Sequence, residues 1–275
     1  MRTLLRRAAR RLASEAVHLA RLVSPPEPGA ARIIYYHRID DEQHRSCVTP
    51  HAFAEQMRLL RDEGFNVVTL SGMRESLDQQ RPFPERTVAI TFDDGFADNY
   101  TQAFPVLARH VLPSTIFLAA GFMDTDELPA IRDRSGIKPL RWSEVEEMAR
   151  HGVAFGAHTI THRSLTGLDA SELRDEIEGS RDLVAEHLGQ PVDTFCYPRG
   201  HFDATVKQAV VDAGFKIACS TIAGSVTPDS PPFTLRRTFI ARDDSLRDFK
   251  RKLDGSFDLL HAASQRLGGT TPSYA

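Results

Sequence analysis

The segment TVAITFDDG, residues 87–95, is the most informative stretch of the chain, because a strand-like run ends there in two adjacent acids. Its first four residues are apolar or β-branched, which is typical of a buried strand in a parallel sheet. Asp93 and Asp94 follow this strand directly, and a helical pattern begins after Gly95. Neighbouring carboxylates repel each other unless a cation lies between them, which favours a functional site. The alternative is an ordinary turn, since Asp and Gly are common in turns and Asp caps helices.

The chain around this segment alternates between strand and helix patterns from residue 32 onward. Strands are predicted at 33–36, 65–70, 88–92, 114–120, 153–157, 193–197, 216–221 and 233–240. Helices are predicted at 50–63, 71–80, 97–110, 143–151, 171–188, 203–214 and 245–253. Repeated strand-then-helix units predict an α/β fold with a parallel sheet and helices outside it. With about seven units, we expect a TIM-barrel-like barrel, and an open doubly wound sheet is the second choice.

Local signals refine several of these helices. Thr49 resembles an N-cap before a proline at the first helical position, and Ser143 fits a capping box with Glu146. Pro105 should break the helix predicted at 97–110. Glu172 and Glu176 are expected to face Arg174 and Arg181 along the long helix at 171–188.

The composition is that of a globular protein, with 275 residues, 41% hydrophobic and 26% charged. A net charge of −3 gives no reason to expect nucleic acid as a partner. Cys196 and Cys219 lie in apolar runs, so we expect reduced core cysteines, which favours a reducing compartment.

The charge is unevenly distributed, because residues 1–23 carry six arginines against one acid, Glu15, a formal +5 that leaves −8 for the rest. We predict a basic amphipathic helix and Pro-rich linker at 1–29, one α/β domain at 30–260 and a flexible tail at 261–275. Arginine interrupts every apolar run that could form a secretory signal, so a cytoplasmic location is expected. The helix could contact the inner membrane face peripherally; packing on the domain or binding a partner are the alternatives.

Side chains that could take part in catalysis lie at the carboxyl ends of the predicted strands. His37, His158 and Tyr197 each end a strand, as the two acids at 93 and 94 do. In a barrel these ends lie on one face, where active sites form. We therefore expect these side chains to share one site.

His158 and His162 lie four residues apart, which would bring both imidazoles to one ion if the backbone turns helically after His158. A pair of surface histidines is the alternative, because this spacing alone is common. With one of the two acids they form a set of three ligands that leaves a position for water, as in catalytic zinc sites, and that also suits Fe(II). The other acid would then be free to act as a base. An EF-hand is excluded, because residues 93–104 lack its alternating acids and closing Glu.

Three segments together resemble the first three motifs of the polysaccharide deacetylases, the NodB-homology family or carbohydrate esterase family 4. They are TFDDG at 91–95, HTITHRSL at 158–165 and FCYPRG at 195–200, in the family's order and at its strand-end positions. The resemblance covers about residues 32–245. It implies a distorted (β/α)7 barrel.

The resemblance also implies roles for the strand-end residues. Asp93 would be the catalytic base, and Asp94, His158 and His162 the metal ligands. The backbone N–H of Tyr197 would help to stabilise the oxyanion.

Two departures from the family pattern affect this assignment. No arginine precedes the proline of the third motif to steer the catalytic acid; Arg236 or Arg237 could substitute, and an exposed strand arginine is the alternative. The family's late histidine motif is absent, and His261 is a poor match. Instead, YYHRI at 35–39 resembles the N-terminal motif of the poly-N-acetylglucosamine deacetylase branch, which implies that His37 protonates the leaving amine; a structural histidine is the alternative.

These features predict a metal-dependent hydrolase that removes N-acetyl or other N-acyl groups from amino sugars of a poly- or oligosaccharide. The expected partner is an N-acetylated glycan, and the expected ion is Zn²⁺, with Fe, Co or Ni as other choices. Two alternatives are an amidohydrolase acting on a small cyclic amide or imide, and a non-catalytic sugar-binding relic. Intact acids at 93 and 94 and histidines at 158 and 162 argue against the relic.

Overall fold

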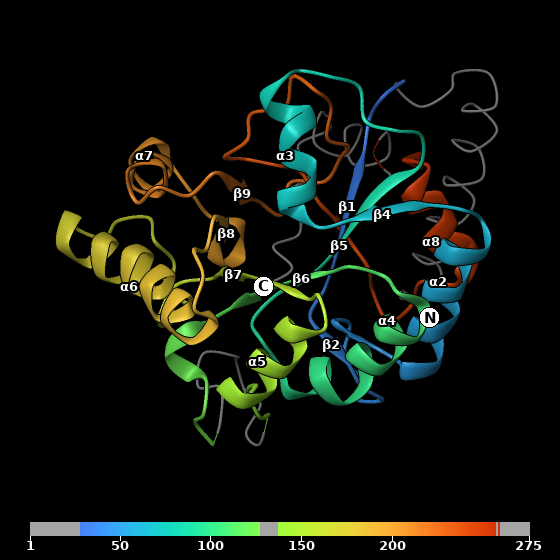
Figure 1. Cartoon of the computed structure of the whole chain (residues 1–275), viewed down its shortest axis with the longest axis horizontal. Helices are drawn as coiled ribbons and strands as arrows, with labels where there is room; N and C mark the ends of the chain where they lie inside the picture. Colours follow the sequence, from blue (N-terminus) through green and yellow to red (C-terminus); the bar gives the residue numbers. More distant parts are fainter. Residues whose placement is uncertain (1–27, 127–136, 257, 259–275) are drawn as a thin grey trace, which may run out of the picture.

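The structure, a computed structural model, describes residues 28–126, 137–256 and 258 and places helices around a central group of strands (Figure 1). The main sheet contains β1 (Arg32–Tyr36), β4 (Asn66–Val68), β5 (Thr87–Phe92), β6 (Thr115–Leu118), β7 (Ala154–Ala157), β8 (Thr194–Cys196), β9 (Ile217–Cys219) and β10 (Thr238–Phe239). Its order is β10-β1-β5-β6-β7-β8-β9, with every pairing parallel. Seven strands on this path, curled and covered by helices, confirm the predicted distorted barrel.

Strand β5 is central to the sheet and delivers the two acids to its carboxyl end. It pairs with β1 along residues 88–92, with β4 along its first half and with β6 at its last two residues. All six of its residues are buried, as the apolar pattern predicts. Because the ladder fixes this strand on both sides, the position of residues 93 and 94 is set by the core of the protein.

The barrel is closed by an extended segment that precedes β10. The Ala218 N–H donates to the Pro232 carbonyl at 2.8 Å, and the Arg237 N–H donates to the Ile222 carbonyl at 2.9 Å. Leu235 forms a parallel bridge with Cys219 at the end of β9. The single strand predicted at 233–240 is therefore divided: its first part follows β9, and only β10 pairs with β1.

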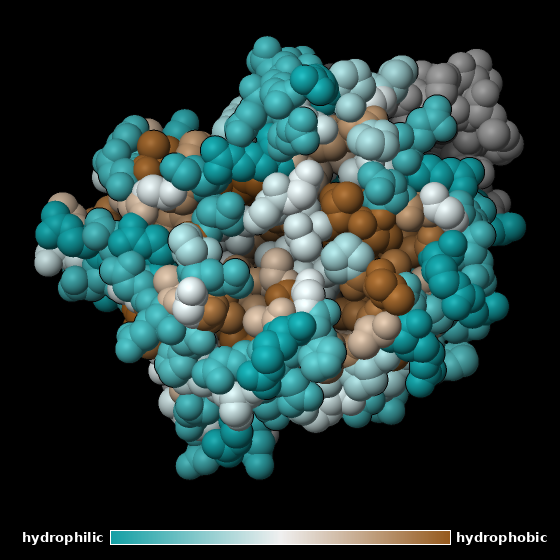
Figure 2. Space-filling view, viewed as in Figure 1, coloured by the Kyte–Doolittle hydropathy of each residue, from teal (hydrophilic) through white to brown (hydrophobic). Residues whose placement is uncertain are grey.

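The helices form the outer layer in Figure 1. They are α2 (Pro50–Asp62), α3 (Leu70–Asp78), α4 (Phe104–His110), α5 (Trp142–Arg150), α6 (Ala170–Leu188), α7 (Ala204–Asp212) and α8 (Leu246–Leu253). Short helical turns occur at η1 (Asn99–Ala103, a π-helix), η2 (Ala120–Phe122) and η3 (Pro198–Gly200). In the same view hydrophilic side chains cover these helices, and apolar atoms gather toward the middle of the face (Figure 2).

Most helix starts agree with the sequence signals, and one does not. Thr49 caps α2 by accepting from the Ala52 N–H, and Pro105 lies where the π-helix gives way to α4. The capping box predicted from Ser143 is wrong, because α5 begins at Trp142. Its first N–H groups are satisfied by Glu144, which accepts from the backbone of residue 141, and by an aspartate at position 124.

Some predictions fall partly outside the described residues. Residues 1–27 and the predicted tail at 261–275 are not described, so the proposed basic helix stays a prediction. Within the described ranges, no helix is long and apolar enough to cross a membrane. The three cysteines are reduced and buried, as expected for Cys196 and Cys219.

Candidate functional site

Asp93, the first acid after β5, is buried beneath a single arginine. Arg237 Nη1 donates to Asp93 Oδ1 and Nη2 donates to Oδ2, both at 2.7 Å. Arg237 is 0% exposed and Asp93 is 3% exposed. Burial by itself would raise the pKa of Asp93, but the charge and hydrogen bonds of Arg237 outweigh burial and lower it. Asp93 is therefore a fixed, ionised carboxylate at the carboxyl end of the barrel.

Arg236 and Arg237 were both possible partners for the catalytic acid, and the structure shows that Arg237 is the one that binds Asp93. Arg236 is exposed, whereas Arg237 points inward and donates Nε to the Ser220 carbonyl at 2.9 Å. Its guanidinium also lies over the Tyr35 ring, 4.3 Å from the ring centre. It reaches Asp93 across 144 residues of sequence because the barrel closes between β9 and β10. In the sequence, the only indication that Arg237 faces inward is the alternation of inward and outward side chains along a strand, and this requires knowing where the strand begins.

Asp94, the second acid, faces two imidazoles rather than a guanidinium. Its Oδ1 lies 3.4 Å from His158 Nε2 and 3.2 Å from His162 Nε2, and all three side chains are almost fully enclosed. The three residues predicted as metal ligands are thus brought together, and their ligand atoms lie within 4.8 Å of one another. Burial raises the pKa of Asp94, but the neighbouring imidazoles outweigh burial and lower it well below its usual value.

The hydrogen bonding of His158 tests whether this group fits a cation. Its Nδ1 lies 2.6 Å from the Cys196 carbonyl oxygen. A carbonyl can only accept, so the proton of the neutral ring is assigned to Nδ1 and Nε2 keeps a lone pair. That lone pair faces the Asp94 oxygen, and two acceptors repel unless a cation or proton lies between them. Asp94 Oδ1 and His162 Nδ1 are also buried without a hydrogen-bond partner among the described atoms. One carboxylate oxygen and two imidazole nitrogens fit Zn²⁺ or a similar divalent ion.

A buried acid from α6 shapes the loop that carries the two histidines. Glu176 Oε2 accepts from the N–H groups of Ile160 and Thr161, both at 2.9 Å, and the Thr161 hydroxyl also donates to this carboxylate. Glu176 is 6% exposed, so the prediction of a surface acid paired along the helix is wrong. The backbone does not turn helically after His158, because φ is positive at Thr159, at 68°, and at His162, at 54°. This loop still brings the two imidazole centres to 4.9 Å.

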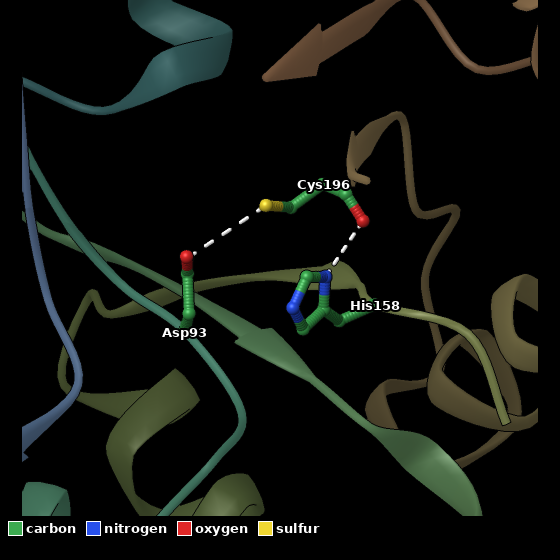
Figure 3. A group of neighbouring side chains, drawn as sticks. All are labelled: Asp93, His158 and Cys196. Carbon is green, nitrogen blue, oxygen red and sulfur yellow. Dashed lines mark hydrogen bonds between the residues drawn. The ribbon is translucent and has the colours of Figure 1, made fainter. Parts of the chain in front are cut away.

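A second group of possible ligands shares His158 with the first and adds Asp93 and Cys196. Figure 3 shows the three side chains of this second group. Its members already have partners: the Cys196 thiol lies 3.8 Å from Asp93 Oδ1 and 3.0 Å from Arg237 Nη2. Burial raises the pKa of Cys196 well above its usual value, whereas a metal needs the thiolate. An ion here would also lie against the buried guanidinium. The group around Asp94 therefore fits a cation better.

His37 follows β1, as predicted, and packs between aromatic rings. Its ring centre lies 5.8 Å from that of Tyr35 and 5.8 Å from that of Phe239. Burial lowers the pKa of His37, and the negative charges of Asp94 and Asp93 oppose this effect. The imidazole therefore lies within electrostatic range of both acids.

Tyr197, predicted to offer its backbone N–H to an oxyanion, uses that group elsewhere. The N–H donates to the Cys219 carbonyl at 3.1 Å, because pairing between β8 and β9 continues one residue beyond β8. The phenol donates to the Phe233 carbonyl at 3.0 Å, and its ring stacks on Phe202. The predicted oxyanion role of Tyr197 does not fit this geometry, and its side chain supports the barrel wall.

Comparison with known proteins adds evidence independent of this geometry. A model of the polysaccharide deacetylase family matches residues 80–218. YxkH of Bacillus subtilis (strain 168), named as a polysaccharide deacetylase, is 28% identical over 220 residues, covering 80% of this chain and 74% of YxkH. The poly-β-1,6-N-acetyl-D-glucosamine N-deacetylase of Escherichia coli (strain K12) is 24% identical over 257 residues, covering 80% of this chain but 38% of that enzyme.

A solved structure confirms the fold. Streptococcus pyogenes deacetylase PplD, determined in complex with acetate, superposes with a TM-score of 0.73 at 22% identity, covering 82% of this chain and 99% of PplD. The family match spans half of the chain and includes the segments of both acids and both histidines. The chain belongs to the polysaccharide deacetylase family.

Proposed function

We propose that this protein is a metal-dependent N-deacetylase that removes acetyl groups from the amino sugars of a polysaccharide. The proposal rests on one observation: two adjacent buried acids, of which Asp93 is held ionised by Arg237 and Asp94 shares an enclosed space with two imidazoles. Metal dependence is general in this family. Because the related Escherichia coli enzyme is named for poly-β-1,6-N-acetyl-D-glucosamine, oligomers of N-acetylglucosamine are the first substrates to test.

Asp94, His158 and His162 would hold the ion, for which we propose Zn²⁺. When bound, this ion supplies Lewis-acid polarisation of the acyl oxygen and lowers the pKa of water. Asp93 accepts a proton from the attacking water as the water oxygen bonds to the acyl carbon. Arg237 keeps Asp93 ionised and fixes both carboxylate oxygens, at some loss of basicity.

His37 acts in the second half of the reaction. Its imidazolium donates a proton to the nitrogen as the bond between nitrogen and acyl carbon breaks. The products are acetate and the free amine of the sugar. The lowered pKa of His37 makes its protonated form a stronger acid toward the departing nitrogen.

Asp93→Asn tests the role of the base. We expect the variant to bind metal normally and to lose about a thousandfold in kcat, since general base catalysis contributes roughly 10²–10⁴-fold. The measurement is acetate release from N-acetylglucosamine oligosaccharides, with and without chelator, alongside the metal content of the purified protein. Asp193→Asn is a matched control, because among the described residues the side chain of that acid accepts only an exposed hydrogen bond from Ser71.

Two results would contradict the proposal. Near-normal turnover by Asp93→Asn would remove Asp93 as the base. Chelator-sensitive hydrolysis of a small cyclic imide, without acetate release from any glycan, would favour the amidohydrolase alternative.

A further inference from the structure

We infer that Asn99, supported by Asp98, is a positioning residue that holds His37 in register with Asp93 and Asp94. This inference rests on the proposed role of His37 as the acid of the reaction. It concerns how that imidazole is fixed, and it assigns work to two buried side chains outside the reacting group.

A catalytic histidine is commonly oriented by a hydrogen bond that its second nitrogen makes with a neighbouring group. Within the described part of the chain, His37 Nδ1 is buried and has no hydrogen-bond partner. Its neighbours, Tyr35 and Phe239, are aromatic rings that limit its space without fixing a direction. The orientation of the imidazole therefore depends strongly on where the backbone of residue 37 is held.

Asn99 holds that backbone directly. Its Nδ2 donates to the His37 carbonyl at 2.9 Å, and Asn99 is 0% exposed. The Asn99 N–H in turn donates to the Phe96 carbonyl at 2.9 Å. Asn99 also begins the π-helix η1, and π-type irregularities occur frequently at functional sites.

Asp98 holds the next two residues with one carboxylate. Its Oδ1 accepts from the Ile39 N–H at 3.0 Å, and its Oδ2 accepts from Arg38 Nε at 2.7 Å. Asn99 Nδ2 also lies 3.2 Å from Asp98 Oδ1, which joins the two anchors. Residues 37, 38 and 39 are thus each bonded to the pair at 98 and 99.

Asp98 and Asn99 belong to the same turn as Asp93 and Asp94. They can therefore position His37 relative to the two acids. The Asp93 N–H donates to the Tyr36 carbonyl at 3.0 Å, so both ends of the segment 93–99 bind the chain around His37. One short turn therefore sets the separation between the proposed base, the proposed ligand Asp94 and the proposed acid. Loss of the Asn99 amide should misplace His37 while leaving the acids and the metal ligands in position.

The test compares Asn99→Ala and Asn99→Asp with His37→Ala and with the double variant His37→Ala/Asn99→Ala in the full chain. Asn99→Asp has nearly the same shape, but it replaces the donor with an acceptor and adds a negative charge beside Asp98, whereas Asn99→Ala removes the donor without adding charge. Asn66→Ala is the matched control, because Asn66 is the only other asparagine of the chain and also donates through Nδ2, to Thr87. Each protein is assayed on an N-acetylglucosamine oligosaccharide and on 4-nitrophenyl acetate, whose phenolate leaves without needing a proton.

For both Asn99 variants we expect kcat on the oligosaccharide to fall about tenfold or more, with metal content and KM unchanged. Activity on 4-nitrophenyl acetate should stay within about twofold of the wild type, since that reaction needs no general acid. The double variant should be no slower than His37→Ala, because Asn99 acts through His37.

Two outcomes overturn the inference in distinguishable ways. If the Asn99 variants lose both activities equally, or lose as much again in the His37→Ala background, Asn99 supports the fold or another group, and the role of His37 stands. If His37→Ala keeps full activity on the oligosaccharide, His37 is not the acid, and the positioning role falls together with that part of the proposed function.

Discussion

The floor of the site, formed by Asp93, Arg237 and Cys196, differs in kind from its rim, formed by Asp94, His158 and His162. In the floor, both carboxylate oxygens are filled by a guanidinium that donates also to a backbone carbonyl. In the rim, a carboxylate oxygen and an imidazole lone pair face each other across 3.4 Å. The floor is complete as folded, whereas the rim brings together the ligand atoms that would hold the proposed cation.

The backbone explains how two adjacent acids reach such different surroundings. Asp94 has a φ of 77°, so the chain turns sharply after Asp93 and the two side chains diverge. Gly95 continues this left-handed turn with a φ of 79°. The two acids therefore cannot exchange their roles unless the turn is rebuilt. We expect substitutions in the floor to lower the stability of the fold and substitutions in the rim to lower the affinity for metal.

The floor should show the largest loss of stability. Arg237→Met would leave the buried Asp93 carboxylate unpaired, and removing one partner of a buried ion pair costs roughly 3–5 kcal/mol. Chemical denaturation would measure this loss, with Arg236→Met as the control, because Arg236 lies next in sequence and is exposed. An Arg237→Met protein as stable as the control would show that the floor does not stabilise the fold.

The same pair predicts how this loss depends on pH. The pKa of Asp93 is lowered, so the stabilisation from the pair is present above the pKa of an unfolded aspartate, about 4, and is lost as pH falls through the folded value. In Arg237→Met burial acts without the guanidinium and raises the pKa of Asp93, so protonation relieves the variant of its unpaired charge as pH falls. The stability difference between wild type and Arg237→Met should therefore narrow toward acid. A difference that widened in acid would contradict the lowered pKa.

The rim should respond through metal rather than through folding. Asp94→Asn is expected to abolish tight metal binding and acetate release, because it removes the only carboxylate of the proposed ligand set. Added Zn²⁺ should raise the melting temperature of the wild type but not of the variant, since a ligand stabilises only a fold that binds it. With chelator present, the two proteins should differ far less than Arg237→Met differs from the wild type. If Zn²⁺ still stabilised the Asp94→Asn protein, the ion would have to bind at another site.

The support beneath the rim should matter less than the ligands themselves. Glu176→Gln replaces a carboxylate oxygen that orders the loop between the two histidines, so we expect metal affinity to fall about 10–100-fold. Titration with Zn²⁺ in a competing chelator would measure this change. Glu178→Gln is the control, because Glu178 lies on the same helix and forms an ion pair with Arg174 at 4.0 Å instead of binding the loop. Equal affinities in both variants would mean that the loop keeps its shape without Glu176.

The strands and helices that depend on local sequence patterns could be predicted. The β-branched run before Asp93, the strand before His158 and the alternating helices each follow from neighbouring residues, so the barrel and its strand-end residues could be predicted. Family resemblance then separated the roles expected for the two acids, and the structure supplies the physical difference between them.

What the sequence could not provide depends on closure and on loop shape. Arg237 reaches Asp93 only because the segment before β10 completes the barrel, and an arginine in a strand-like run carries no mark of facing inward. Glu176 lies on a helix whose charge pattern suggested an exposed face, yet its carboxylate binds a loop that has no regular period. The Tyr197 N–H bonds to Cys219 because strand pairing extends by one residue, and no sequence pattern indicates such an extension.

The smallest expected effect concerns residues with a left-handed backbone. One of them, His162, belongs to the rim, whereas Val111 lies outside the site. Val111 ends α4 with a φ of 54° and is 85% exposed, an unfavourable backbone for a β-branched residue. Val111→Asn should stabilise the protein by roughly 0.5–1 kcal/mol without changing activity, because asparagine tolerates this conformation. Val111→Thr replaces one exposed methyl with a hydroxyl but keeps the branch at Cβ, so it should give little gain. His162 has the same φ, yet His162→Gly should relieve that strain only by losing the metal. If Val111→Asn gives no gain in thermal or chemical denaturation, left-handed residues are not costly here, and the rim is less strained than its dihedral angles indicate.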